Sequence, residues 1–269
     1  MNCQSCVLFR PDSSNYDEYK ICKNIISTET QRSKLNNKFV VGRFSVLPFY
    51  KELEEDLKVN GCTLVNSYKE HKYIADFLYY DDVKEFTFPT YFDSYRLPED
   101  KYVVKGVTNS RKHEWNTLMF AENKRRAIEI SCDLKLDSLL RTQDIIFRKY
   151  IPLQTLEYGL NGLPITNEWR LFYFNNDLIA YGFYWSCVED NVVKSLLDDF
   201  RGNGIKFANH VASILSNKAT FFVIDVAKTQ SGEWILVECN DAQMSGLNTI
   251  DPKLFYTSLK GALDDFKNV

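Results

Sequence analysis

The sequence predicts a protein of the α+β class, in which a small parallel α/β unit precedes a larger region of antiparallel hairpins. In residues 1–88, short apolar segments alternate with segments of helical spacing, a pattern typical of a parallel sheet with crossover helices. In residues 89–269, apolar segments pair across short turn-forming sequences, which predicts hairpins. With 269 residues, 45% of them hydrophobic, the chain is long enough for one large or two smaller domains, and general disorder is excluded.

The first unit is predicted from apolar segments and helix signals. Pro48 opens a segment in which Leu53 and Leu57 lie four residues apart, and Gly61 ends it. A proline at the start and a glycine just past the end are typical of a helix. The elements expected here are strands at 6–10, 39–42 and 62–65 and helices at 48–61 and 68–79.

The larger region begins in a looser stretch between Pro89 and Pro98, the first candidate boundary. A strand ending at Lys105 leads into a polar loop, residues 106–112, that can close over a ligand. Turn-forming residues at 175–177 and 228–232 predict two hairpins. The elements expected here are strands at 102–105, 144–151, 169–174, 178–185, 220–227 and 233–240, helices at 116–134, 206–215 and 251–267, and a turn region at 159–166.

Charge and cysteine content narrow the functional class. The chain has 33 Lys and Arg against 36 Asp and Glu, which argues against a generic binder of nucleic acid, although a local basic groove stays possible. No apolar run is long enough to span a bilayer, and residues 1–10 lack a secretory signal. The seven cysteines are scattered and odd in number, so we expect reduced thiols and a cytoplasmic protein. Cys3 and Cys6 form an isolated CxxC, which is weak evidence for zinc or redox chemistry.

The last predicted hairpin carries the most informative side chains. Asp225 interrupts an apolar strand, and Glu238 and Asn240 lie two residues apart on the partner strand, so these two point to the same face. Two carboxylates and an amide oxygen on one face suit Mg²⁺, which prefers oxygen ligands. The alternative is a solvent-facing polar stripe.

Three further positions predict contacts to a nucleotide. Lys105 ends a strand before the polar loop, where a lysine can reach a phosphate as a point charge, although a solvated lysine is the simpler alternative. The strand at 144–151 stops at Pro152, which leaves main-chain groups of Lys149 and Ile151 free to bind an adenine, unless it is an ordinary edge strand.

Glu168 and Arg170 share one face of the next strand. The glutamate can accept hydrogen bonds from ribose hydroxyls, and the arginine can bind phosphate oxygens or a developing anion; the alternative is a surface ion pair. The three histidines show no metal-ligand spacing, and neither a GxSxG nor a Walker-type phosphate loop occurs. A serine hydrolase and a P-loop NTPase are therefore not supported.

In this order, the motifs resemble those of the ATP-grasp superfamily, in particular its carboxylate–amine ligases. The resemblance covers roughly residues 89–250, and the stretch 159–186 is similar to a poorly characterised subgroup found in bacteria and their viruses. It implies an ATP-grasp fold, with two α+β subdomains at about 89–147 and 148–269 that grip ATP, behind an N-terminal domain at 1–88. It implies nucleotide binding by Lys105, Arg148, Lys149, Tyr150, Ile151 and Glu168, catalysis by Arg170, Lys112 and Arg111, and Mg²⁺ (or Mn²⁺) binding by Asp225, Glu238 and Asn240.

The sequence also departs from the family pattern. The loop 106–112 is not rich in glycine and carries Arg111 and Lys112, whose charges can substitute for main-chain contacts to phosphate. A second ATP-binding lysine is not evident, although Lys84 and Arg96 are candidates. Aromatic residues stand where the family has a phosphate-side arginine and asparagine: Tyr181, Tyr184 and Trp185.

The resemblance implies an ATP-dependent ligase that joins a carboxylate substrate to an amine acceptor, such as an amino acid, peptide or protein, through an acyl phosphate. Two alternatives stay open. One is an ATP-grasp phosphotransferase, whose product keeps the phosphoryl group, and the other is a non-catalytic nucleotide-binding module. The sequence does not identify the substrates or the oligomeric state.

Overall fold

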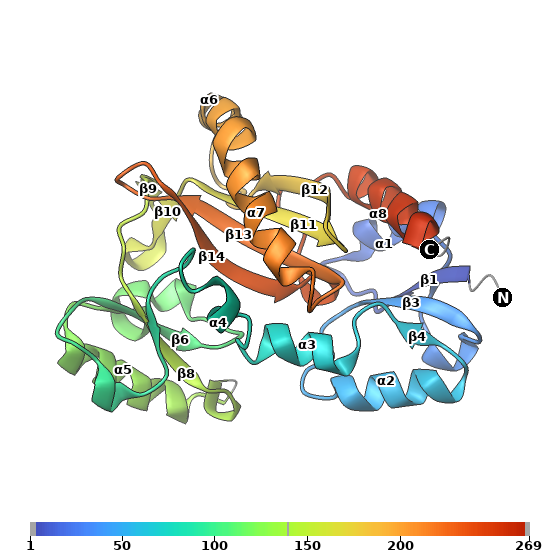
Figure 1. The fold of residues 1–269 in the computed structure, drawn as a ribbon, viewed down its shortest axis with the longest axis horizontal. Coiled ribbons are helices and arrows are strands. Elements are labelled where there is room, and N and C mark those ends of the chain that lie inside the picture. The colour runs from blue at the N-terminus through green and yellow to red at the C-terminus, as the bar shows by residue number, and fades with distance from the viewer. Residues whose placement is uncertain (1–3, 139, 267–269) are drawn as a thin grey trace.

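The computed structural model describes residues 4–138 and 140–266. Within them the chain forms three four-stranded sheets and one two-stranded ribbon. Figure 1 shows the N-terminal sheet at one end of the molecule, the second sheet at the other end, and the third sheet above and between them. No helix in these residues is long and apolar enough to cross a membrane.

The N-terminal sheet is parallel, as predicted, with strand order β2-β1-β3-β4. Its strands are β1 (Gln4–Phe9), β2 (Thr28–Glu29), β3 (Lys38–Arg43) and β4 (Thr63–Leu64), and its helices are α1 (Tyr16–Ile25) and α2 (Tyr50–Val59). The sequence did not predict α1 or β2. Cys6 is a buried free thiol, and Cys3 lies outside the described residues.

The helix predicted at 68–79 is instead two helices, α3 (Tyr68–Ala75) and α4 (Tyr80–Val83). The break lies at Phe77, whose φ of 62° is left-handed and incompatible with a continuous right-handed helix. The aromatic ring of Phe77 is buried in the core between the two helices. Burial of this ring therefore accompanies the break.

The second sheet is antiparallel, with order β5-β8-β6-β7. Its strands are β5 (Thr90–Tyr91), β6 (Tyr102–Gly106), β7 (Phe120–Ala121) and β8 (Ile145–Lys149), and α5 (Lys124–Leu136) packs on one face. The prediction of one helix over 116–134 is wrong in its first part. Residues Trp115–Met119 form a turn of π-helix and β7 follows, because the helix proper begins where Asn123 caps the backbone N–H of Arg126 at 2.9 Å.

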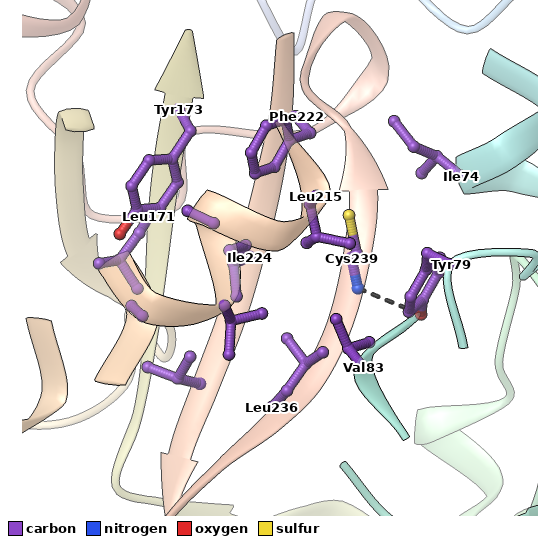
Figure 2. Packing of buried hydrophobic residues seen from close by; sticks show 14 of the residues in the cluster. Ile74, Tyr79, Val83, Leu171, Tyr173, Leu215, Phe222, Ile224, Leu236 and Cys239 are labelled. Carbon is purple, nitrogen blue, oxygen red and sulfur yellow. Dashed lines mark hydrogen bonds between the residues drawn. The ribbon is translucent and has the colours of Figure 1, made fainter. Parts of the chain in front are cut away.

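The third sheet contains both predicted hairpins, with order β12-β11-β13-β14. Its strands are β11 (Glu168–Phe174), β12 (Asp177–Phe183), β13 (Phe221–Lys228) and β14 (Trp234–Asp241). One face packs against α7 (Ile205–Leu215), α3 and α4 in the largest hydrophobic cluster, part of which is drawn in Figure 2. The helix α6 (Asp190–Asp199) was not predicted, and none of its residues is buried.

The opposite face of the third sheet changes character along its strands. At one end, Phe172, Phe174 and Phe221 pack against β1, β3 and the C-terminal helix α8 (Pro252–Phe266), so the N-terminal sheet and the third sheet share one hydrophobic core. Toward the other end, the residues of the same parity are Arg170 and Asp225, which are charged. The charged part of this face forms the wall of a candidate site.

Short elements complete the fold. The turn region predicted at 159–166 is a ribbon of β9 (Thr155–Tyr158) and β10 (Pro164–Thr166) around a single 3₁₀ turn. The described 3₁₀ turns are Arg32–Lys34, Ser94–Arg96, Lys112–Glu114, Leu140–Thr142, Leu160–Gly162 and Ala242–Met244, and a second π-helical turn, Phe200–Gly204, joins α6 to α7.

Candidate active site

A cavity lies between the second and third sheets, and we call it the first cavity. Its walls come from β6 and β8 on one side and from β11 and β14 on the other, and it contains about 760 Å³ of space, its open mouth included. Its lining includes eight of the residues predicted for the site: Lys105, Lys112, Arg148, Lys149, Tyr150, Ile151, Glu168 and Glu238.

Strand alternation explains why charged and apolar residues separate here. Along β6, Tyr102 and Val104 are buried against α5, whereas Val103 and Lys105 line the first cavity. On the neighbouring strand β8, Phe147 joins the same core, and Arg148 faces the cavity. The second sheet therefore presents cations to the third sheet.

Glu238 is the acidic group at the centre of this arrangement. Its Oε2 accepts a hydrogen bond from Nζ of Lys105 at 2.7 Å, and its Oε1 accepts one from Nδ2 of Asn240 at 3.0 Å. Burial by itself would raise the pKa of Glu238, but the ammonium groups of Lys105 and Lys112 outweigh burial and hold that pKa well below its usual range. Glu238 is therefore a carboxylate at neutral pH.

Neighbouring elements hold β14 in place on both sides of Glu238. The backbone N–H of Cys239 donates to the hydroxyl of Tyr79 at 3.2 Å, the dashed line in Figure 2. A β-bulge follows the pair Asp225–Glu238, and the carbonyl of the extra residue, Val237, accepts a hydrogen bond from Arg148 at 2.5 Å. The bulge thus connects the two sheets beside the site.

Asp225 lies directly opposite Glu238 on β13 and is fully buried. Both of its carboxylate oxygens accept hydrogen bonds from the guanidinium of Arg170, at 2.8 and 2.7 Å. A bidentate pair of this kind compensates the cost of burying both charges. The predicted ligand set of Asp225, Glu238 and Asn240 therefore lies close together, but Asp225 is engaged by Arg170.

Glu168 stands on β11 with 4% of its surface exposed. Its Oε2 accepts a hydrogen bond from the hydroxyl of Thr166 at 3.1 Å, whereas its buried Oε1 has no hydrogen-bond partner. Burial is the main cause that raises the pKa of Glu168 to about 7, against the opposing effect of Lys112. An unpartnered, cavity-lining carboxyl oxygen is a site for a hydroxyl group of a ligand.

The loop 106–112 places its two cations differently. Nζ of Lys112 donates to the hydroxyl of Tyr184 at 2.7 Å, lies over the Tyr184 ring, and lines the first cavity. Arg111 was expected to act beside it. The structure instead pairs Arg111 with Asp137 and Glu114, and Arg111 lines neither of the cavities described here, because the acids at this end of α5 hold it.

The predicted adenine-binding strand lines the first cavity through Arg148 to Ile151. The backbone N–H of Lys149 donates to the carbonyl of Pro89 at 2.8 Å, so this N–H is engaged within the sheet. The Lys149 side chain pairs with Asp100 at 2.6 Å. The two candidates for an additional ATP-binding cation, Lys84 and Arg96, are exposed, and neither lines the cavity.

A second cavity adjoins the first. It is lined by residues of the N-terminal unit, of the loop 106–112 and of the third sheet, and contains about 910 Å³ of space, its open mouth included. Arg170 and Asn240 line the second cavity, and Glu238 lines both cavities. Sequence reasoning did not find His71 and Asp241, which also line it, because they lie 170 residues apart and match no motif.

Comparison with known proteins agrees with this architecture. A family model of the ATP-grasp domain, family 3 of its clade, matches residues 96–259. No curated protein is similar enough in sequence to match.

Solved structures share the fold at low sequence identity. They include D-cycloserine synthetase DcsG (TM-score 0.58, 12% identity, 97% of this chain and 98% of that one) and a RimK-domain ATP-grasp protein from Sphaerobacter thermophilus (0.59, 12%, 98% and 99%). A third is the ATP-grasp ligase PsnB in complex with a variant of its minimal precursor, Mg and ADP (0.52, 10%, 97% and 99%). Because the family model covers more than half of the sequence and the fold agrees, this chain belongs to the ATP-grasp superfamily, in the clade family whose model it matches.

Proposed function

We propose that the protein is an ATP-dependent carboxylate–amine ligase, which forms an amide through an acyl phosphate and releases ADP and phosphate. The observation that carries this proposal is the position of Glu238 on the border of both cavities. A nucleotide in the first cavity can then place its terminal phosphate beside the second cavity, where a carboxylate and an amine have room.

The first cavity has the chemistry that ATP requires. Phe88, Met119 and the segment ending at Ile151 offer apolar surface and main-chain groups for the adenine. The unpartnered Oε1 of Glu168 can accept a hydrogen bond from a ribose hydroxyl. Lys105 and Lys112 supply positive charge for the phosphates.

The donor set also suits Mg²⁺. Within the described residues no three His, Cys, Asp or Glu side chains converge on a metal position, so an ion here needs the amide oxygen of Asn240 beside Glu238, with phosphate oxygens and water completing its shell. We propose Glu238 and Asn240 as direct ligands and Asp225 as a third if its pair with Arg170 opens. Bound there, Mg²⁺ would neutralise charge on the phosphates.

In the proposed reaction, a carboxylate oxygen of the substrate attacks the terminal phosphorus, and the bond to ADP breaks. Arg170, which lines the second cavity, stabilises the negative charge of the acyl phosphate and of its adduct with the amine. Thr108 and Asn109 of the loop 106–112 line the same cavity, so the loop limits the access of water, which would hydrolyse the intermediate.

The test is incubation with Mg²⁺, ATP, pooled amino acids and short peptides, followed by measurement of ADP and of product masses. A ligase gives ADP and a product whose mass equals that of two pool members less one water. ADP with a stable phosphoester would identify a phosphotransferase instead. Binding of Mg·ATP without ADP formation would indicate a nucleotide-binding module.

The substitution Glu238→Gln removes the carboxylate from the border of the two cavities. ADP formation should fall by about 10²–10³-fold, the loss typical of a group that stabilises transition-state charge. Glu233→Gln, on the exposed turn of the same hairpin, is the matched control and should keep full activity. Equal activity of the two variants would contradict the proposed role of Glu238.

A further inference from the structure

The second cavity contains a histidine–aspartate pair that the assignments above do not use. His71 on α3 is 3% exposed, and its Nδ1 lies 3.0 Å from Oδ2 of Asp241 at the end of β14. The imidazole stacks on the ring of Tyr50, with centroids 4.0 Å apart and an interplanar angle of 3°. Ring stacking and the bond to Asp241 together fix the position of the imidazole.

The surroundings of Asp241 determine which ring nitrogen carries the proton. Its Oδ1 accepts hydrogen bonds from Nδ2 of Asn66 at 3.1 Å and from the backbone N–H of Gln243 at 3.0 Å. Donors at both oxygens are those of an ionised carboxylate. Asp241 therefore accepts from an N–H at Nδ1 of His71, which leaves the lone pair on Nε2.

The pair stands beside the position of the proposed chemistry. His71 and Asp241 line the same cavity as Arg170 and Glu238, and Glu238 also borders the first cavity. The charged and titratable groups around the imidazole are Asp241 on β14, Tyr50 on α2, and Arg170 and Glu238 across the cavity.

We propose that His71 is the general base of the amide-forming step, with Asp241 as its positioning residue; this inference rests on the proposed ligase function. The amine enters as an ammonium and gives one proton to Nε2 of His71. Its nitrogen then forms the C–N bond to the acyl carbon, the C–O bond to phosphate breaks, and phosphate leaves with that electron pair. The second proton leaves with the phosphate, and one N–H remains on the amide.

A structural role would use only the Nδ1 side of the ring, which joins α3 to β14. The substitution His71→Asn separates the two roles, because the asparagine amide nitrogen takes nearly the place of Nδ1 and can still donate to Asp241. The variant has no group in place of Nε2. Thermal unfolding and Mg·ATP binding should therefore stay close to those of the wild type, which verifies that the variant folds.

The experiment compares two nucleophiles. Wild type and His71→Asn are incubated with Mg·ATP and the pooled amino acids and peptides, with and without excess hydroxylamine. Hydroxylamine is a much weaker base than an amino-acid amine, so it attacks an acyl phosphate without a protein base, and the hydroxamate product reports the first half-reaction. His210→Asn, on the exposed side of α7, is the matched control.

We expect amide formation by His71→Asn to fall at least ~100-fold, the lower range for loss of a general base, while hydroxamate formation stays within about threefold of wild type. Added imidazole should restore part of the amide formation. Equal loss of both products, or loss of neither, would overturn the role of His71. If wild type makes neither product, the ligase function itself is wrong, and the base role falls with it.

Discussion

Glu168 is a buried carboxyl whose charge the folded protein accommodates poorly without a ligand. Its Oε1 has no hydrogen-bond partner, and burial raises its pKa from 4.5 to about 7. A raised carboxyl pKa makes the folded state bind a proton that the unfolded chain has already released. The stability associated with this proton is complete below about pH 4.5 and is lost as the pH rises through 7. The position suits the binding of a ribose at a cost in stability.

The substitution Glu168→Gln should therefore stabilise the protein at alkaline pH while it weakens nucleotide binding. The pKa difference between 4.5 and about 7 corresponds to roughly 3 kcal/mol of unfolding free energy above pH 8. The gain over wild type should shrink to near zero as the pH falls to 5. Urea unfolding of both proteins across this range measures it.

Glu157→Gln, on the exposed strand β9, is the control for that experiment and should show no trend with pH. A stability difference for Glu168→Gln that did not change between pH 5 and 8.5 would contradict the account of its ionisation.

Individual site residues differ in how far the sequence predicts them. Glu238 and Asn240 were paired correctly on one face, because a spacing of two on a strand fixes their side. The engagement of Asp225 by Arg170 was not predicted, since nothing in two separate strands specifies that they pair in this register. His71 was not recognised, because its partner lies on another element.

Among the elements, the hairpins of the third sheet were predicted within a few residues, since alternation and turn sequences are local signals. The helices α1 and α6 were missed because they lack an extended buried stripe: α1 buries only Cys22, and α6 buries no residue. The helix predicted over 116–134 is interrupted because β7 pairs with β6, a tertiary contact that overrides local periodicity.

The helix α3, which carries His71, depends on a capping box at its first turn. The hydroxyl of Ser67 accepts from the backbone N–H of Glu70 at 3.3 Å, and the carboxylate of Glu70 accepts from the N–H of Ser67 at 2.7 Å. Ser67→Ala should lower the free energy of unfolding by about 1 kcal/mol, measured by chemical denaturation.

The control for the capping experiment is Glu189→Ala at the N-cap of α6, where the side chain makes no capping hydrogen bond. Its stability should match wild type within error. If Ser67→Ala were as stable as Glu189→Ala, the capping box would contribute nothing to α3.

In the whole molecule, the third sheet connects the hydrophobic core to the proposed chemistry. Its two faces carry different clusters, and the face that joins the N-terminal sheet also carries Arg170 and Asp225. The boundary proposed at residue 88 follows directly on a segment that contacts β14: the N–H of Leu236 donates to Phe86, and Thr87 donates to the Leu236 carbonyl. Residues 1–88 are therefore joined to the rest through a shared core and a shared sheet edge.

A chain that begins at residue 89 should not fold cooperatively, although it contains the segment 96–259 that matches the family model. Without β1 and β3, the rings of Phe172, Phe174 and Phe221 lose cover. Fully exposing a side chain of this size costs about 1.5–3 kcal/mol, so three of them cost much of the ~5–15 kcal/mol that stabilises a typical protein. Calorimetry of the shortened chain should show no cooperative transition, and co-expression with residues 1–88 should restore one, because the two fragments complete one core. A transition near the wild-type temperature in the 89–269 fragment alone would instead establish it as an independent domain.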